Sequence, residues 1–173
     1  MEGIENPLVG LLNIGSEATK GSDAIKQASQ LIAESGLNYH GFVEGDDIYR
    51  GTVNVIVTDG FVGNVSLKTG EGLASLVSHV LKTEFNRNWL TRLAAVCALP
   101  VLKRVRRKLD PRRYNGASLL GLNGIVVKSH GSADSSSFLN AIKIASLEIE
   151  NDVPQRISSA IESHFRQAEE AVT

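Results

Sequence analysis

Cysteine is almost absent from this sequence: Cys97 is the only one among 173 residues. The chain therefore cannot form an internal disulfide or a cysteine-based metal cluster, and the disulfide-rich secreted class is excluded. The four histidines, at positions 40, 79, 130 and 164, show no metal-ligand spacing either. No apolar run approaches the ~20 residues that a membrane-spanning helix needs. We therefore expect no metal site and no membrane crossing.

Several common site motifs are also missing. The sequence has no G-x-x-x-x-G-K-S/T phosphate loop, no G-x-G-x-x-G dinucleotide fingerprint and no G-x-S-x-G nucleophile elbow. With 42% apolar and 21% charged residues, the composition is that of an ordinary soluble globular protein, and the length predicts one domain.

Charge is distributed unevenly along the chain. Residues 85–113 hold nine of the 18 basic side chains and only one acid, Asp110, so this stretch carries +8. The remaining residues have nine basic and 18 acidic side chains and so carry -9. The net charge of -1 is therefore the sum of one strongly basic and one strongly acidic part of the chain. Such asymmetry usually indicates that one surface meets an anionic partner.

Hydrophobic periodicity predicts alternating strands and helices. The expected strands are residues 8–13, 39–43 and 53–57, with one or two more within 117–127. The expected helices are residues 22–36, with Ser22 as the N-cap, about 64–84, 134–150 and one that begins near Pro154. This alternation predicts a layered α/β fold with a mostly parallel sheet. With so few strands the sheet would be small, and a partner or a further segment would complete its edge.

Polar, glycine-bearing loops follow three of the expected strands. The first, Asn13 to Gly21, holds Glu17 and Lys20; the second, in "VTDGFVGN", holds Asp59, Gly60, Gly63 and Asn64; the third, in "KSHG", holds Ser129 and His130. Loops at the carboxyl ends of parallel strands share one edge, where a helix beginning near Asn64 would favour an anion. The alternatives are that Asp59 and Asn64 only cap a turn and a helix, that Lys20 is a solvated surface lysine, and that His130 is structural.

A basic and apolar segment, "NWLTRLAAVCALPVLKRVRRKL", occupies residues 88–109. Its apolar positions include Trp89, Leu90, Leu93, Leu99 and Leu102, and its cations include Lys103, Arg104, Arg106 and Arg107. This pattern is typical of an interfacial helical hairpin, kinked near Pro100, that meets an anionic lipid surface or an acidic protein. A solvated basic helix is an alternative, and nucleic acid is disfavoured because Trp89 is the only aromatic residue in the run.

Four blocks, "VGLLNIGSEATKG", "TDGFVGNVSLKTGEG", the basic segment and "YNGASLLGLNGIVVKSHGSAD", together resemble the bacterial phosphate acyltransferases of phospholipid synthesis, the PlsX family. The resemblance covers roughly residues 3–165. It implies an acyltransferase that converts fatty acyl carrier protein thioester and inorganic phosphate into acyl phosphate and free carrier protein, without a cofactor. It also implies a three-layer α/β/α sandwich like the isocitrate and isopropylmalate dehydrogenases, and a cytoplasmic homodimer docked peripherally on the membrane.

The same resemblance implies roles for individual residues. Lys20, Asp59 and Asn64 match the catalytic positions of the family, while Gly60 and Gly63 belong to the same motif. Lys68, Ser129 and His130 match motif positions expected to contact phosphate or to support the structure. The basic hairpin, about residues 85–113, would be an insertion that associates with the membrane.

The family members are about twice as long as this chain, so residues 1–173 would be the C-terminal portion of a single domain. Two alternatives follow. The chain could be a non-catalytic scaffold that keeps the hairpin and the dimer surface. It could also be a phosphate acetyltransferase that uses coenzyme A, although a soluble short-chain product would need no hairpin.

Overall fold

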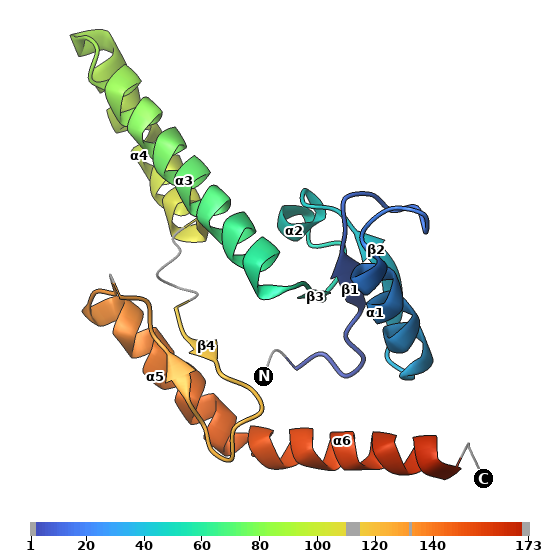
Figure 1. Cartoon of the computed structure of the whole chain (residues 1–173). Helices are drawn as coiled ribbons and strands as arrows, with labels where there is room; N and C mark the ends of the chain where they lie inside the picture. The colour runs from blue at the N-terminus through green and yellow to red at the C-terminus, as the bar shows by residue number, and fades with distance from the viewer. Residues whose placement is uncertain (1–2, 110–114, 132, 171–173) are drawn as a thin grey trace. The chain divides into compact units, whose positions relative to one another are not determined.

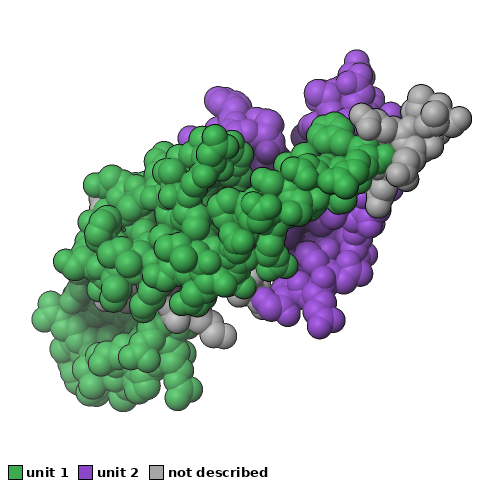
Figure 2. Space-filling view, turned by 90° about the horizontal axis from the view of Figure 1, so that it is seen from below, with its two compact units in different colours: residues 1, 71–173 green, residues 2–70 purple. Residues whose placement is uncertain are grey.

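The computed structural model describes residues 3–109, 115–131 and 133–170, and the side chains of residues 106, 108, 109 and 167–170 lie outside this description. The chain forms two compact units (Figure 2). One comprises residues 2–70, and the other comprises residues 71–173 with residue 1. Each unit is described by itself below.

The first unit is built on a three-stranded parallel sheet with the order β2-β1-β3 (Figure 1). Its strands are β1 (Val9–Leu12), β2 (Tyr39–Val43) and β3 (Val55–Val57). All four residues of β1 are buried, because this strand is paired on both sides. The predicted parallel sheet is confirmed, and the prediction of β2 matches to the residue.

A small apolar core holds this sheet together. Leu12, Val43 and Val53 are buried, and Leu8, Ile48 and Ile56 pack against them. Gly10 makes this packing possible, because a Cβ there would lie 2.7 Å from a methyl group of Val43. The close approach fixes β1 against its neighbour, and the register between the two strands shifts at this point.

Two helical connections link the strands. Helix α1 (Asp23–Glu34) begins at Ser22, whose Oγ accepts a hydrogen bond from the Ile25 amide at 3.4 Å, so the predicted N-cap is confirmed. The hydroxyls of Ser29 on α1 and Tyr39 on β2 lie 2.9 Å apart, which ties this helix to the sheet. Helix α2 (Asp47–Arg50) then precedes β3.

Helix α3 (Gly60–Phe85) leaves the sheet and crosses the unit boundary at residue 70. A three-residue turn joins it to α4 (Trp89–Leu109), which contains Pro100. Asn88 and Thr91 cap α4 reciprocally: the Asn88 side chain accepts from the Thr91 amide at 3.0 Å, and the Thr91 hydroxyl accepts from the Asn88 amide at 3.1 Å. In the structure α3, the turn and α4 form a helical hairpin, whereas the sequence placed the hairpin within about residues 85–113. Residues 89–109 of that range form one helix with Pro100 inside it, and residues 110–113 lie outside the described residues.

The rest of the second unit is a short hairpin packed on a helix. Strands β4 (Ala117–Ser118) and β5 (Val127–Lys128) pair antiparallel and form a sheet of their own, and β4 and β5 both contact α5 (Ser135–Glu150). Helix α6 (Val153–Glu170) follows. The expectation that residues 128–131 follow a strand of the parallel sheet is therefore wrong in this structure: an eight-residue loop returns the chain beside β4.

Candidate functional site

The strand order brings two of the predicted loops to one place. Within the first unit, β2 and β3 flank β1 on opposite sides, so the chain passes from one edge of the sheet to the other between β2 and β3. Leu11 is paired with Val57 in the parallel register, so the loops after β1 and β3 leave the same end of the sheet. Ligands of open parallel sheets bind at such a switch point, outside the carboxyl ends of the strands.

Lys20 lies in the loop after β1 and is exposed. Its amide donates to the carbonyl of Glu17 at 3.0 Å, and its carbonyl accepts from the side-chain amide of Asn13 at 3.2 Å. The stem of its side chain passes over Gly15, where a Cβ would lie 3.1 Å from Lys20 Cγ. The loop thus fixes the backbone of Lys20 and the first carbons of its side chain, while the residue as a whole remains exposed to solvent.

Asp59 lies at the end of β3 and caps α3. Its Oδ1 accepts hydrogen bonds from the amides of Phe61 at 2.9 Å and Val62 at 3.0 Å. The helix therefore begins at Gly60, and the expectation that it begins near Asn64 is wrong by one turn. The two glycines that suggested a loop are accommodated because the Asp59 cap satisfies amides that the first turn leaves unpaired.

The other candidate residues of this motif lie on the first turns of α3. Asn64 and Lys68 are exposed and one helical turn apart, which places them on the same face as Gly60. A Cβ on Gly60 would meet open space, whereas a Cβ on Gly63 would lie 2.9 Å from a methyl carbon of Thr58. Gly63 is therefore required by packing within the protein, and Gly60 leaves room beside the helix N-terminus.

Ser129 and His130 lie in the second unit, directly after β5. Asn115, which no sequence motif singled out, holds both residues in place. Its Nδ2 donates to Ser129 Oγ at 2.9 Å and to the Ser137 carbonyl at 2.8 Å, and its Oδ1 accepts from the His130 amide at 2.8 Å. Ser129 therefore has a structural partner, and the His130 side chain is exposed. An asparagine beside a glycine before a strand was the only signal in the sequence.

The hairpin places apolar side chains in solvent. Trp89 is 73% exposed, and Leu90, Leu93 and Leu99 are also exposed, while Leu102 is half-buried. Lys103, Arg104 and Arg107 are exposed, and the side chain of Arg106 lies outside the described residues. No helix within residues 3–109, 115–131 and 133–170 is both long and apolar enough to cross a membrane.

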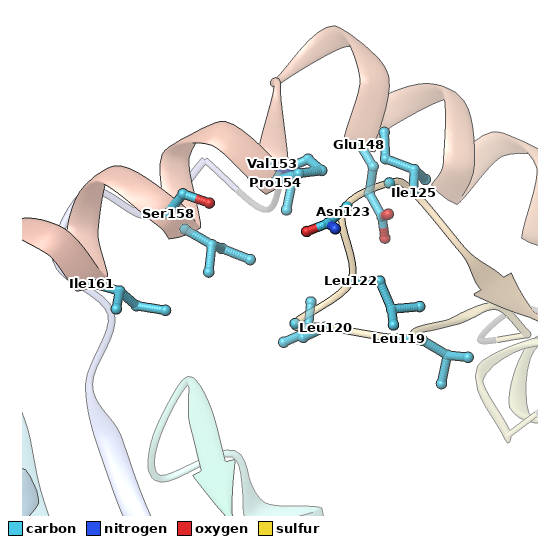
Figure 3. A pocket seen from close by; sticks show the side chains of 13 residues that line it. Leu119, Leu120, Leu122, Asn123, Ile125, Glu148, Val153, Pro154, Ser158 and Ile161 are labelled. Carbon is cyan, nitrogen blue, oxygen red and sulfur yellow. The ribbon is translucent and has the colours of Figure 1, made fainter.

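A pocket of about 210 Å³ lies within the second unit, between the β4–β5 loop and helices α5 and α6 (Figure 3). Its apolar lining comes mainly from Leu119, Leu120 and Leu122 of the loop and from Pro154, Ile157 and Ile161 of α6. Glu148 is buried at its border and is hydrogen-bonded to the Ser118 hydroxyl. The described residues contain no cluster of histidine, cysteine and acidic side chains that could bind a metal ion.

Comparison with known proteins connects these features to one family. The chain is 57% identical to a phosphate acyltransferase of Nitrosococcus oceani over 162 residues, 94% of this chain and 48% of that protein. It is 56% identical to a phosphate acyltransferase of Methylococcus capsulatus, over 93% of this chain and 48% of that protein. A phosphate acyltransferase of Paraburkholderia phytofirmans is 54% identical over 99% of this chain and 46% of its own length.

The chain thus spans about half the length of the curated relatives it matches. The family model described as "Fatty acid synthesis protein" matches residues 1–156, which include both strand-end loops of the first unit and the helical hairpin. This protein belongs to the fatty acid synthesis protein family.

Proposed function

We propose that this chain carries the phosphate-binding and acyl-transferring groups of a phosphate acyltransferase. The reaction takes fatty acyl carrier protein and inorganic phosphate, and yields acyl phosphate and free carrier protein. The supporting observation is that the loop with Lys20 and the segment from Asp59 to Asn64 leave the same end of the sheet on the adjacent strands β1 and β3. The relatives named phosphate acyltransferase support the same reaction. On this proposal the sheet belongs to a larger α/β/α sandwich.

The chemistry is a direct substitution at the thioester carbonyl. A phosphate oxygen attacks the carbonyl carbon, the new C–O bond forms, and the C–S bond breaks as the carrier thiolate leaves and takes a proton. Lys20 balances charge on phosphate and on the developing oxyanion, and the Asn64 amide donates to that oxyanion. Asp59 Oδ1 is engaged by two backbone amides, so Oδ2 is the oxygen that orients Lys20 or accepts a proton from hydrogen phosphate.

The direct test measures phosphate-dependent release of the carrier thiol. The purified chain is incubated with long-chain acyl carrier protein and phosphate, alone and with a separate polypeptide that corresponds to the part of the relatives it does not match. Release that depends on phosphate and disappears in a Lys20→Ala chain supports the proposal. No release in either arrangement would overturn it.

The α3–α4 hairpin is proposed to hold the protein on an anionic lipid surface at the inner face of the cell membrane. Trp89 lies at the turn and Lys103 lies 14 residues later on α4, which corresponds to roughly 21 Å along a helix. If the hairpin inserted only its tip into the membrane, Lys103 and Arg104 would lie far from the lipid headgroups. The proposal therefore requires α4 to lie along the surface, where Trp89, Leu93 and Arg104 all reach the interface.

The single tryptophan makes this docking measurable. Binding to vesicles that contain anionic lipid should shift Trp89 fluorescence to shorter wavelength, while neutral vesicles should not. Changing Lys103 and Arg104 to glutamine should weaken vesicle binding about 30-fold, since each basic side chain contributes about 1 kcal/mol at such a surface. A matched pair outside the hairpin, Lys143 and Arg156 changed to glutamine, should leave binding unchanged. Equal losses in both pairs would contradict a specific role for α4.

The apolar side chains of the hairpin also favour association between copies, which suits the homodimer implied by the family resemblance. All residues of α3 are described and none is buried, although Leu67, Leu73 and Leu76 are apolar and more than half exposed. The same exposure favours a second candidate function, a scaffold that binds membrane and partner without turnover. Vesicle binding with no phosphate-dependent thiol release, even with the complementary polypeptide, would favour the scaffold.

A further inference from the structure

The side chain of Asn13 lies beneath the loop that carries Lys20. It follows β1 directly and is only 6% exposed, so its polar amide is buried. Its Oδ1 accepts from the Ile14 amide at 2.9 Å, its Nδ2 donates to the Lys20 carbonyl at 3.2 Å, and its own amide donates to the Val43 carbonyl at 2.9 Å. One buried side chain thus joins the end of the strand to a residue seven positions later.

Two glycines allow this arrangement. Gly21 has a φ of +85°, which favours glycine, and a Cβ there would collide with Asn13 Oδ1. Gly15 is buried, and a Cβ there would lie 2.6 Å from Glu17 Oε2 and 3.1 Å from Lys20 Cγ. Larger residues at these positions would push the loop away from Asn13 or displace the lysine stem.

We propose that Asn13 is a positioning residue for Lys20. The hydrogen bond to the Lys20 carbonyl fixes the backbone from which the side chain starts, and the contact over Gly15 fixes its stem, so that the ammonium group occupies a limited region at the end of β1. This inference rests on the proposed function of Lys20. A charge-balancing group is effective only when it is held in place before the reaction, and a displacement of about 1 Å can cost about 100-fold in rate.

The role predicts a specific response to Asn13→Asp. The carboxylate can still accept from the Ile14 amide, but it cannot donate to the Lys20 carbonyl and would repel it. The Lys20–Gly21 peptide bond should then be released, and trypsin, which cuts after lysine, should cleave there at least about 10-fold faster. Gly21→Ala should also break the hydrogen bond between Asn13 and Lys20, because the added Cβ would collide with Asn13 Oδ1, and trypsin should again cleave faster at this bond. A matched control is Asn38→Asp, because the exposed Asn38 also donates to a backbone carbonyl, that of Asn6 at 3.3 Å.

Thiol release then separates positioning from general support of the fold. We expect Asn13→Asp to lower kcat about 10- to 100-fold with little change in the KM for acyl carrier protein, and to have no further effect in a Lys20→Ala chain. Equal losses in both backgrounds would overturn the proposal, because Asn13 would then act independently of Lys20. Unchanged cleavage at Lys20–Gly21 would also overturn it. If no parent chain shows thiol release, the proposed function fails, and the cleavage assay alone decides whether Asn13 holds Lys20.

Discussion

The loops after β1 and β3 leave the sheet side by side but are held in different ways. The first is closed by a buried side chain, Asn13, whose hydrogen bond reaches Lys20 across seven residues. The second is held by the exposed Asp59, whose carboxylate accepts from the amides two and three residues later. Lys20 therefore depends on a contact with a buried residue seven positions earlier, and Asp59 depends on the start of a helix. Substitutions should separate these two kinds of support.

The largest effect is expected from Lys20→Ala. If Lys20 balances phosphate and the oxyanion as proposed, its loss should lower phosphate-dependent thiol release on the order of 1,000-fold. The unfolding midpoint should not change, because the residue is exposed. Lys20→Arg is the matched variant. It keeps the charge but replaces a compact ammonium with a planar fork, so it should recover only part of the rate. A fully active Lys20→Ala chain would remove Lys20 from the mechanism.

Asn64→Ala should give the second largest loss of activity. Removing one oxyanion donor typically costs about 100- to 1,000-fold, and we expect this loss in kcat rather than in phosphate affinity. Asn64 is exposed on the second turn of α3, so the variant should fold normally. Steady-state kinetics at varied phosphate concentration would check this. An unchanged kcat would assign the oxyanion contact to another donor.

Substitutions at Asp59 can separate its role as the N-cap of α3 from its proposed role in proton transfer. Asparagine is as good an N-cap as aspartate, so Asp59→Asn should keep the stability of α3 while lowering kcat about 100-fold if the carboxylate takes part in proton transfer. Asp59→Ala should add a loss of about 1 kcal/mol in stability. Thermal unfolding and thiol release, measured on the same samples, would compare them. Equal activity of the wild type and Asp59→Asn would reduce Asp59 to a cap.

Asn115 extends the comparison to the loop after β5. Asn115→Ala would remove three hydrogen bonds from a half-buried position, so we expect a loss of about 2 kcal/mol in the free energy of unfolding. Chemical denaturation would measure it. Asn123→Ala, on the exposed β4–β5 loop, is a control that should change little. A loss below about 0.5 kcal/mol would mean that water replaces the Asn115 amide without cost.

The smallest effect is expected at Ser22. Its cap on α1 is long, at 3.4 Å and exposed, so Ser22→Ala should cost about 0.5 kcal/mol and leave thiol release unchanged. Denaturation beside the activity assay would check both. A large loss of activity would show that α1 contributes to the Lys20 loop more than its local contacts indicate.

Local signals in the sequence predicted much of the first unit. The apolar run ending at Asn13, the cap at Ser22 and the strand candidate Tyr39–Val43 each specify structure through neighbours in the chain. The start of α3 was missed because Gly60 and Gly63 have low helix propensity, and the Asp59 cap that offsets them was assigned to a turn.

Other features that the sequence could not predict depend on residues that are farther apart in the chain. The eight residues between β4 and β5 gave no indication that the chain would return antiparallel and form a separate two-stranded sheet. The same holds for Asn13 and Asn115, whose amides bind residues that are 7 and 22 positions away. Asparagine at a strand end suggests only a turn, because its partner is set by the fold.

Four glycines should make the first half of α3 less stable as a helix than the second half. Gly60, Gly63, Gly70 and Gly72 lie within the first half of this 26-residue helix, and each lowers helix stability by roughly 1 kcal/mol relative to alanine. Gly70 is tolerated for a steric reason, since the Tyr49 hydroxyl occupies the space of a Cβ. In amide hydrogen exchange, the turns that carry Asn64 and Lys68 should therefore open more often than those from Leu73 to Phe85. The end of the helix that carries the proposed oxyanion donor would then be the more easily opened end, and bound phosphate should slow its amide exchange.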